Sequence, residues 1–283
     1  MRIERLTLFE FDPPQNCVRK RGLALTMSKV YKLDEDACDT LIISDLHLGS
    51  IVSRAEDVRR MLQSKTFQRL ILLGDIFCDL DFRRLTKEHW ELLSHIRKLS
   101  NPKRKVEVVW VEGNHDRGLS EVMSHLVGVK VYQEYQWTYA GRRYLAIHGH
   151  QYDSFLVRNA ALSAAGEWLY MHLQKLDSKS KLISRFLDRQ NTKWMRLSPR
   201  VASGALAYAA QRRADVVFCG HTHAAMQAER KGVRYFNSGC WTTEDPTYIT
   251  VDELGVRIHD YVSEQANRAL DLEPASGAEV PVE

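Results

Sequence analysis

The sequence predicts an α/β fold with a layered core, on the basis of three observations. After a polar start, short apolar runs alternate with amphipathic segments, which is the pattern of strands and helices in turn. Beyond Gly128, outside one helical segment, the apolar runs are short and strand-like, as in a two-sheet sandwich. The chain is 44% hydrophobic and 27% charged, which is typical of globular proteins. No apolar run approaches the ~20 residues needed to span a bilayer.

In the first half of the core, buried strands alternate with amphipathic helices. Strands are predicted at residues 40–43, 70–73 and 106–111, and helices at residues 55–62 and 88–99. In the second half, residues 129–139 and 143–147 flank Gly141, which predicts a hairpin. Later strands are expected at residues 216–219, 233–237 and 248–251.

Composition and charge predict four parts of the chain. Residues 1–36 are expected to form an N-terminal arm, residues 37–153 and 214–262 the core, residues 154–213 a helical insertion or lid, and residues 263–283 a disordered tail. The insertion has helical periodicity and contains eleven basic but only three acidic residues, a net charge of +8. The whole chain carries +4, so the positive excess lies in this segment.

The five cysteines argue against a cysteine-based site. They are odd in number, scattered and without a C-x-x-C pair, so neither a disulfide framework nor a zinc ribbon is expected. The N-terminus lacks the apolar run and cleavage site of a signal peptide. We therefore expect reduced thiols and a cytoplasmic protein, and the search for a functional site turns to histidine and aspartate.

Polar side chains of one chemical kind follow five of the predicted strands. They are, in chain order, Asp45 and His47, then Asp75, then Asn114, then His148, and finally His221 and His223. Because ligands bind at the carboxyl ends of strands in open α/β sheets, these loops are expected to converge. Asp, Asn and His together suit a divalent cation of intermediate hardness. Seven donors are too many for one tetrahedral ion and suit two ions that share a carboxylate, about 3.5–4 Å apart.

The spacing within the motifs supports this interpretation. Asp45 and His47 are separated by one residue, so in an extended backbone both side chains face the same side, and His221 and His223 repeat the spacing. Glycines beside the polar residues would let the backbone approach the ions closely. They are Gly74, Gly113, Gly149 and Gly220. Each motif alone is common, but five of them at strand ends in this order predict a metal site.

The ordered set D-x-H, G-D-x-x, G-N-H-D, H-G-H and G-H-x-H resembles that of the calcineurin-like metallophosphoesterases over residues 39–260. The resemblance implies a four-layer α/β/β/α sandwich and a dinuclear site. The implied ligands of the first metal are Asp45, His47, Asp75 and His223, and those of the second are Asp75, Asn114, His148 and His221. Manganese is the expected metal, with iron and zinc as alternatives because their ligand preferences overlap.

The resemblance also implies hydrolysis of a phosphoester or phosphoanhydride by a metal-bridging hydroxide. Two cations lower the pKa of a bridging water and neutralise the phosphoryl oxygens that it attacks. His115 suits protonation of the leaving oxygen or stabilisation of transition-state charge, with a structural hydrogen bond as the alternative. Asp116 would orient His115. His150 is an alternative to His148 as a ligand, or a substrate contact.

Two stretches are similar to the UDP-2,3-diacylglucosamine hydrolases of lipid A synthesis, H-G-H-Q-Y-D at residues 148–153 and Y-F-N-S-G-C-W at residues 235–241. The similarity implies hydrolysis of that lipid-linked nucleotide diphosphate to UMP and 2,3-diacylglucosamine 1-phosphate. Apolar side chains of the insertion would line a slot for acyl chains, and its basic residues would meet the diphosphate or an anionic membrane surface, peripherally on the inner membrane. The substrate-binding residues expected on this basis are Arg158, Arg189, Lys193, Arg196 and His150. An apolar core under a solvated basic face is the alternative for the insertion.

Two other functions remain compatible with the motifs. A nuclease or cyclic-nucleotide phosphodiesterase would use the same metals, with the basic insertion binding phosphates. The insertion lacks regularly spaced aromatics for base stacking, which argues against nucleic acid as a partner. Two residues depart from the pattern of the diacylglucosamine hydrolases. One branch of these enzymes carries arginine in place of His115, and an acid is usual in place of His150. A non-catalytic scaffold with this fold is the third possibility, although such a protein has little need of every ligand and of His115.

Overall fold

A computed structural model describes residues 36–265, apart from residues 80, 119–121, 123–124, 126, 154–197 and 263–264. Nearly all of the predicted N-terminal arm, most of the predicted insertion and most of the predicted tail therefore lie outside the described residues. No helix within the described part of the chain is both long enough and apolar enough to cross a membrane. The four cysteines among these residues are free thiols.

The first sheet has six strands, four of which run parallel. In spatial order they are β11 (Gly255–Asp260), β10 (Thr247–Asp252), β1 (Ala37–Ile43), β2 (Thr66–Leu73), β3 (Glu107–Val111) and β4 (Val131–Tyr132). Strands β1 to β4 are parallel to one another, whereas β10 pairs antiparallel with β1 and β11 antiparallel with β10. The carboxyl ends of β1, β2 and β3 therefore lie side by side at one edge of this sheet.

The second sheet has five strands and a parallel centre. In spatial order they are β5 (Tyr135–Tyr139), β6 (Arg142–Ala146), β7 (Val216–Cys219), β9 (Val233–Asn237) and β8 (Met226–Arg230). Strands β6, β7 and β9 are parallel, and the antiparallel β5 and β8 form the two edges. The predicted hairpin is present between β5 and β6, where Ala140 and Gly141 both have positive φ, as a tight two-residue turn requires.

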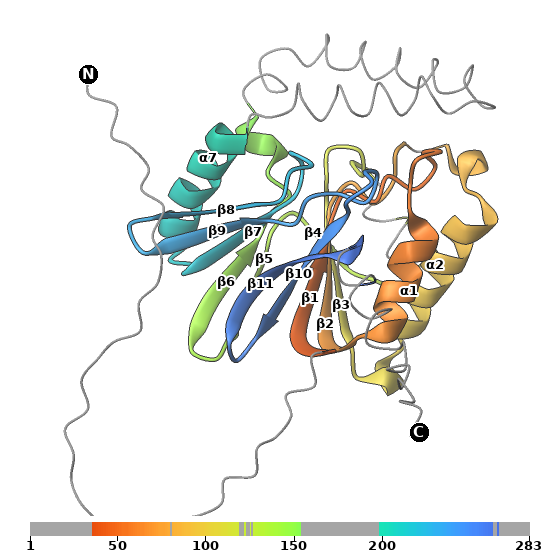
Figure 1. The fold of residues 1–283 in the computed structure, drawn as a ribbon, viewed down its shortest axis with the longest axis horizontal. Helices are drawn as coiled ribbons and strands as arrows, with labels where there is room; N and C mark the ends of the chain where they lie inside the picture. Colours follow the sequence, from red (N-terminus) through yellow and green to blue (C-terminus); the bar gives the residue numbers. More distant parts are fainter. Residues whose placement is uncertain are drawn as a thin grey trace, which may run out of the picture. The chain divides into compact units, whose positions relative to one another are not determined.

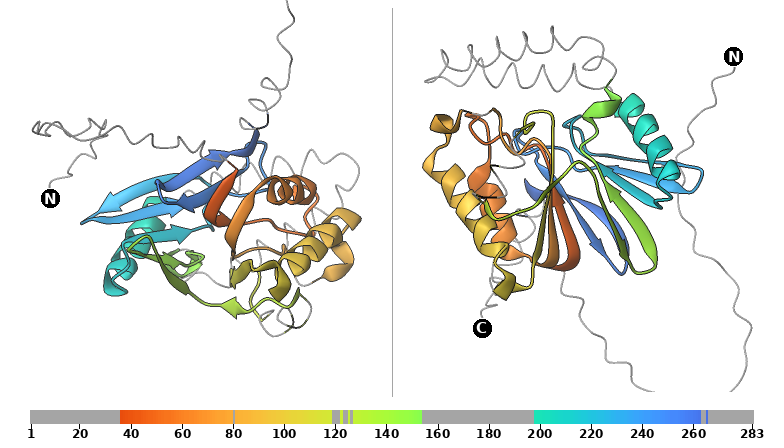
Figure 2. Two further views of the ribbon diagram at one scale, coloured as in Figure 1. Left: turned by 90° about the horizontal axis from the view of Figure 1, so that it is seen from below. Right: turned by 180° about the vertical axis from the view of Figure 1, so that it is seen from behind.

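Among the described residues, three α-helices cover the outer faces of the two sheets (Figures 1 and 2). They are α1 (Ala55–Ser64) and α2 (Lys87–Leu99) on the first sheet, and α7 (Ser198–Gln211) on the second. Short 3-10 helices occur at η1 (Phe82–Arg84), η2 (Pro102–Arg104) and η3 (His150–Tyr152). The described chain is thus an α/β/β/α sandwich, as the sequence predicts.

Each of the three interfaces between layers has its own apolar core. Alternation along β1 shows why: Leu41 and Ile43 pack under α1 and α2, whereas Ile42 points into the space between the sheets. The central strands are buried on both faces, which explains their nearly continuous apolar sequences. Between the sheets, Trp137, Tyr144 and Phe218 stack on one another.

The observed elements differ from the expected ones in three places, each for a physical reason. Residues 129–139 form two strands rather than one, because the chain leaves the first sheet after β4 and enters the second at β5. Strands β8 and β11 were not predicted, because an edge strand keeps one side polar and lacks a long apolar run. Residues 198–211, predicted as the last part of the insertion, form helix α7, which packs on β7 and β9.

The contact between α7 and η3 provides a test of this packing. A Cβ on Gly204 would lie 2.7 Å from the ring of Tyr152, so alanine at this position requires the layers to shift. We expect Gly204→Ala to lower the free energy of unfolding by about 1–3 kcal/mol, as overpacking does. Helix propensity alone predicts the opposite sign, a gain of about 1 kcal/mol. The measurement is urea denaturation.

The matched control is Ala207→Gly, which makes the reverse exchange at an exposed position of the same helix. It should cost about 0.5–1 kcal/mol through propensity alone. A Gly204→Ala protein more stable than the wild type would show that α7 does not press on Tyr152.

Candidate metal centre

The loops that follow β1 and β2 are joined by backbone hydrogen bonds. Asp45 N donates to Gly74 O at 3.0 Å, and His47 N donates to Asp75 O at 3.0 Å. Leu48 N continues the pattern one step further by donating to the carbonyl of Ile76 at 2.8 Å. These bonds fix the D-x-H loop against the loop that carries Asp75, so the position of each acidic residue depends on the other.

Hydrogen bonds between the two sheets bring the later loops to the same place. The backbone N of His221 donates to both carboxylate oxygens of Asp45, at 3.2 and 3.0 Å. Gly220 N donates to the carbonyl of His148 at 3.1 Å, and Trp241 N to the carbonyl of Asp45 at 3.1 Å. The predicted convergence of loops from both sheets is therefore observed.

The backbone at the polar residues is left-handed and not extended. Five of the nine described non-glycine residues with positive φ are candidate ligands, namely Asp45, His47, Asp75, His221 and His223, with φ between 46° and 68°. Such dihedrals cost on the order of 1–3 kcal/mol each and concentrate at functional sites. The expectation of an extended backbone at these residues is thus wrong. The one-residue spacing also does not predict which side chains meet, because His221 and His223 lie in different clusters.

The first cluster consists of Asp45, His47 and His223, whose potential ligand atoms all lie within 4.8 Å of one another. His223 Nε2 is 3.1 Å from Asp45 Oδ1 and 3.1 Å from His47 Nε2. All three side chains are at least 88% shielded from solvent. Two imidazole nitrogens and a carboxylate oxygen thus face one point from β1 and β7.

The second cluster consists of Asp75, His148 and His221, also within 4.8 Å. His148 Nδ1 is 2.9 Å from the carbonyl of Leu73, which can only accept, so this nitrogen donates and Nε2 is the ring nitrogen that could bind a metal. That Nε2 lies 3.2 Å from Asp75 Oδ2. All three residues are at most 2% exposed.

Asp75 connects the second cluster to a third grouping, formed with His47 and His115. Its Oδ1 accepts from the backbone N of His115 at 2.9 Å, while Oδ2 lies 3.9 Å from His115 Nε2. His47, the other member of this grouping, also belongs to the first cluster. The carboxylate of Asp75 therefore lies between the two clusters, as a shared ligand would.

The carboxylates and imidazoles of the two clusters strongly shift one another's pKa. Burial raises the pKa of Asp75, but His148 and His115 outweigh it and hold this pKa well below its usual range. Burial also opposes protonation of His148, yet Asp75 raises its pKa to about 9. Similarly, burial lowers the pKa of His223, but Asp45 raises it well above the ordinary value. Each carboxylate thus holds a proton on one imidazole, and a cation would supply that positive charge instead.

Two buried atoms without hydrogen-bond partners fit a divalent cation. Asn114 Oδ1 is buried and accepts no hydrogen bond within the described part of the chain. His221 Nδ1 is likewise buried without a partner, while its Nε2 lies 3.2 Å from Asp153 Oδ2. A buried acceptor left unpaired is costly, so these two atoms call for a cation or a donor. Their donor chemistry fits the manganese, iron or zinc that the sequence suggests, without choosing among them.

Gly113 and Gly220 are required by the close approach of these loops. A Cβ on Gly113 would overlap the carboxylate and backbone N of Asp75, and a Cβ on Gly220 would overlap the carboxylate of Asp45 and the side chain of Ser44. The predicted reason for glycine beside the polar residues, close backbone approach, is therefore correct, although the groups approached are the carboxylates themselves.

His115 and Asp116 have different environments. His115 Nδ1 lies 2.8 Å from the carbonyl of Cys78, to which it donates, so its Nε2 is directed toward Asp75. The carboxylate of Asp116 is only 1% exposed and accepts from the backbone of the loop after Asp75, at Ile76 N (3.2 Å) and Phe77 N (3.0 Å).

The hydrogen bonds of the Asp116 carboxylate reach the loop that follows Asp75, and the expectation that Asp116 orients the ring of His115 stays a prediction. Burial, followed by the nearby charge of Asp75, raises the pKa of Asp116 to about 6. Its hydrogen bonds show that it positions the backbone of the Asp75 loop, a role that the backbone amides of a turn create and the sequence alone does not reveal.

Of the five predicted substrate-binding residues, the structure describes only His150. His150 lies in η3, with its ring centroid 5.5 Å from that of His148 and its Nδ1 buried without a partner among the described residues. It belongs to none of the three groupings, so His148 is the better candidate ligand. Arg158, Arg189, Lys193 and Arg196 lie outside the described residues.

Two residues at the site were missed by the sequence analysis. Asp153 is buried and contacts His221 Nε2, which leaves Nδ1 of that ring for a metal. Cys240 lies against His223: burial raises the pKa of this thiol, but His223 outweighs burial and lowers it. Their only sequence signal was their place in the stretches at residues 148–153 and 235–241.

The fold and the two clusters define a metallophosphoesterase. A family model described as calcineurin-like phosphoesterase matches residues 39–225, well over half of the chain. The protein belongs to this family and is a hydrolase that acts on phosphoester bonds. No curated protein matches the sequence.

Solved structures resemble the chain only distantly. An archaeal phosphodiesterase is 17% identical, with a TM-score of 0.42, over 78% of this chain and 98% of that chain. The phosphoesterase Yfce from E. coli is 20% identical, with a TM-score of 0.41, over 75% of this chain and 87% of that chain. Zinc-bound Vps29 from Entamoeba histolytica is 13% identical, with a TM-score of 0.38, over 78% of this chain and 98% of that chain.

The unpaired oxygen of Asn114 leads to a test that separates metal binding from stability. Without metal, the buried Oδ1 of Asn114 accepts no hydrogen bond within the described part of the chain. Asn114→Leu should therefore leave the free energy of unfolding of the metal-free protein unchanged or raise it by about 1 kcal/mol. The stabilisation produced by added Mn²⁺ should fall, because one ligand is lost. Both are measured by thermal unfolding with EDTA and with Mn²⁺.

The control is Asn237, a fully buried asparagine whose side-chain oxygen has a hydrogen-bond partner. Asn237 Nδ2 donates to Gly220 O at 2.6 Å, and its Oδ1 accepts from Gly239 N at 3.0 Å. Asn237→Leu should therefore be destabilising with and without metal. An Asn114→Leu protein with the full Mn²⁺-dependent gain would exclude Asn114 as a ligand.

Proposed function

We propose that this hydrolase is a dinuclear enzyme in which Asp75 is the ligand shared by both ions. The first ion would be held by Asp45, His47 and His223, and the second by Asn114, His148 and His221. The observation that carries the proposal is the position of the Asp75 carboxylate, in contact with His148 and grouped with His47 and His115. When bound, two divalent cations activate water and neutralise the charge of the phosphoryl group.

The protein's own residues would position and protonate the substrate. His115 is held by the hydrogen bond from its Nδ1 to the carbonyl of Cys78, which leaves Nε2 to deliver a proton to the leaving oxygen. Asp116 holds the Asp75 loop in place by accepting hydrogen bonds from backbone amides of that loop. Asp153 keeps His221 in the tautomer that offers Nδ1.

We further propose UDP-2,3-diacylglucosamine as the substrate, hydrolysed to UMP and 2,3-diacylglucosamine 1-phosphate. Support comes from the motif at residues 148–153, because its last residue, Asp153, contacts the candidate ligand His221. In the sequence, the predicted basic insertion begins at the residue that follows Asp153. Arg158, Arg189, Lys193 and Arg196 would contact the diphosphate, with His150 near the second ion, and the basic surface would meet an anionic membrane.

Activity and metal content together should distinguish the role of Asp75 as a shared ligand from that of His115 as a general acid. Asp75→Ala should abolish hydrolysis of bis-p-nitrophenyl phosphate and lower the metal content below that of the wild type. His115→Ala should keep the wild-type metal content and lower kcat by roughly 10²–10⁴, the range for loss of a general acid. The assays are steady-state kinetics and elemental analysis of the same samples.

His95→Ala, on α2 away from both clusters, serves as the control and should keep wild-type activity and metal content. Full activity of Asp75→Ala would refute the shared-ligand proposal. A wild-type protein that binds metal but hydrolyses neither a diester nor a pyrophosphate would instead be a scaffold.

The lipid substrate is tested through the insertion. Deletion of residues 179–196 should impair hydrolysis of UDP-2,3-diacylglucosamine at least tenfold more than that of bis-p-nitrophenyl phosphate, because only the acylated substrate would use the slot and the basic side chains. The measurement is kcat/KM for both substrates.

A triple variant, Arg189→Gln, Lys193→Gln and Arg196→Gln, covers the possibility that the deletion disturbs folding. It should show the same selective loss. Equal losses for both substrates in the two variants would argue against a lipid-binding lid and favour a nucleotide phosphodiesterase.

A further inference from the structure

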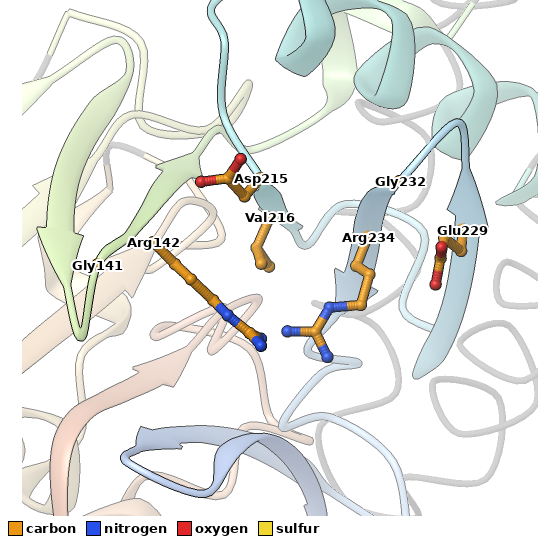
Figure 3. Close-up of a pocket in the computed structure, with 7 residues that line it drawn as sticks. All are labelled: Gly141, Arg142, Asp215, Val216, Glu229, Gly232 and Arg234. Atoms are coloured by element: carbon orange, nitrogen blue, oxygen red, sulfur yellow. The ribbon is translucent and has the colours of Figure 1, made fainter. Parts of the chain in front are cut away.

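A polar cavity lies at the end of the second sheet opposite the candidate metal centre (Figure 3). Its volume is about 530 Å³, and it opens between the turn at Gly141, the start of β7 and the turn at Gly232. These are the amino ends of β6, β7 and β9, whereas the candidate ligands follow carboxyl ends. Arg142 precedes His148 by six residues, so the two sites are about 20 Å apart at 3.3 Å per residue.

Two arginines point toward each other across this cavity (Figure 3). Arg142 in β6 is two residues before Tyr144, and Arg234 in β9 is two residues before Phe236. Both aromatic rings lie in the core between the sheets, so the alternation of a strand places both guanidinium groups on that same face. The side chain of Arg234 also lies over the Phe236 ring, at 5.7 Å from its centroid.

One nitrogen of the Arg234 guanidinium, Nη2, is buried without a hydrogen-bond acceptor among the described residues. Glu229 lies directly opposite Arg234 in the β8–β9 pair, yet Figure 3 shows that the arginine turns away from it and toward Arg142. The other acid of the cavity, Asp215, is used by Arg143: its Oδ2 accepts from the backbone N of Arg143 at 2.8 Å.

The turns around the cavity add positive charge. Arg213 precedes β7, and Lys231 lies in the β8–β9 turn; neither they nor Arg142 and Arg234 form an ion pair among the described residues. Two like charges that converge without an anion repel each other, and a buried N–H without an acceptor is costly. Both costs vanish if a ligand with several anionic oxygens occupies the cavity.

We propose that Arg142 and Arg234 form a binding site for a phosphate group, distinct from the metal centre. Planar guanidinium groups bind phosphate through paired N–H···O hydrogen bonds, and two of them facing each other can hold a dianionic, tetrahedral oxyanion. The phosphate has two possible sources, free inorganic phosphate or the phosphomonoester headgroup of a lipid. The site is accessible from the turns and does not require the metal centre to be intact.

Isothermal titration with inorganic phosphate tests the site directly. The wild type should show one class of phosphate binding that Arg234→Gln loses or weakens at least tenfold, and Arg142→Gln, at an exposed position, should do the same. Lys231→Gln is the control, because it removes the same charge from the neighbouring turn without lining the cavity. Asp75→Asn should keep this binding, which separates it from phosphate at the metal centre.

The second arm identifies the source. Vesicles of phosphatidylcholine with phosphatidic acid should bind the wild type more than Arg234→Gln if the headgroup enters the cavity, and equally if the site takes only free phosphate. The proposal is overturned if Arg142→Gln and Arg234→Gln bind both phosphate and vesicles as Lys231→Gln does, since charge alone would then explain the binding. Circular dichroism of each variant confirms that the fold is retained.

Discussion

The contact between the carboxylate of Asp75 and the imidazoles around it is the interaction on which the site depends. This side chain is 1% exposed, comes from a residue with left-handed backbone, and touches His148 while it also accepts the backbone N–H of His115. Burying a carboxylate is costly unless positive charge and hydrogen-bond donors surround it. Two imidazoles supply part of this charge in the structure, and two cations fit the same arrangement.

The rest of the sandwich holds that carboxylate in position. Parallel strands of both sheets end at one edge. Backbone–backbone hydrogen bonds join the loops after β1 and β2, and the loop after β7 donates from the backbone N of His221 to the carboxylate of Asp45. Asp116 supports the Asp75 loop from the core, where Trp110 Nε1 also donates to it at 3.4 Å. Positive φ at the candidate ligands is therefore maintained by the hydrogen bonds of a rigid scaffold.

The layers could be predicted from the sequence, and so could the clustering of the polar residues that follow the strands, because both leave strong local signals. Buried parallel strands are apolar on both faces, and each polar motif follows such a run directly, as at Ile43 and Cys219. Edge strands such as β8 were missed because half of their side chains face solvent. The roles of Asp116 and Asp153 were missed because they depend on partners 40 and 68 residues away, and no local pattern encodes such contacts.

The two ends of the second sheet differ in the charge they present. The imidazoles of His148, His221 and His223 follow its carboxyl ends and face the cation site, whereas Arg142 and Arg234 lie at its amino ends and would attract anions. The central claim, that Asp75 joins two ions, is tested most directly by anomalous diffraction from crystals of the manganese-loaded protein. Two peaks are expected, one beside Asp45 and His223 and one beside His148 and His221, both within bonding distance of Asp75. A single peak, or peaks that the Asp75 carboxylate does not reach, would contradict the claim.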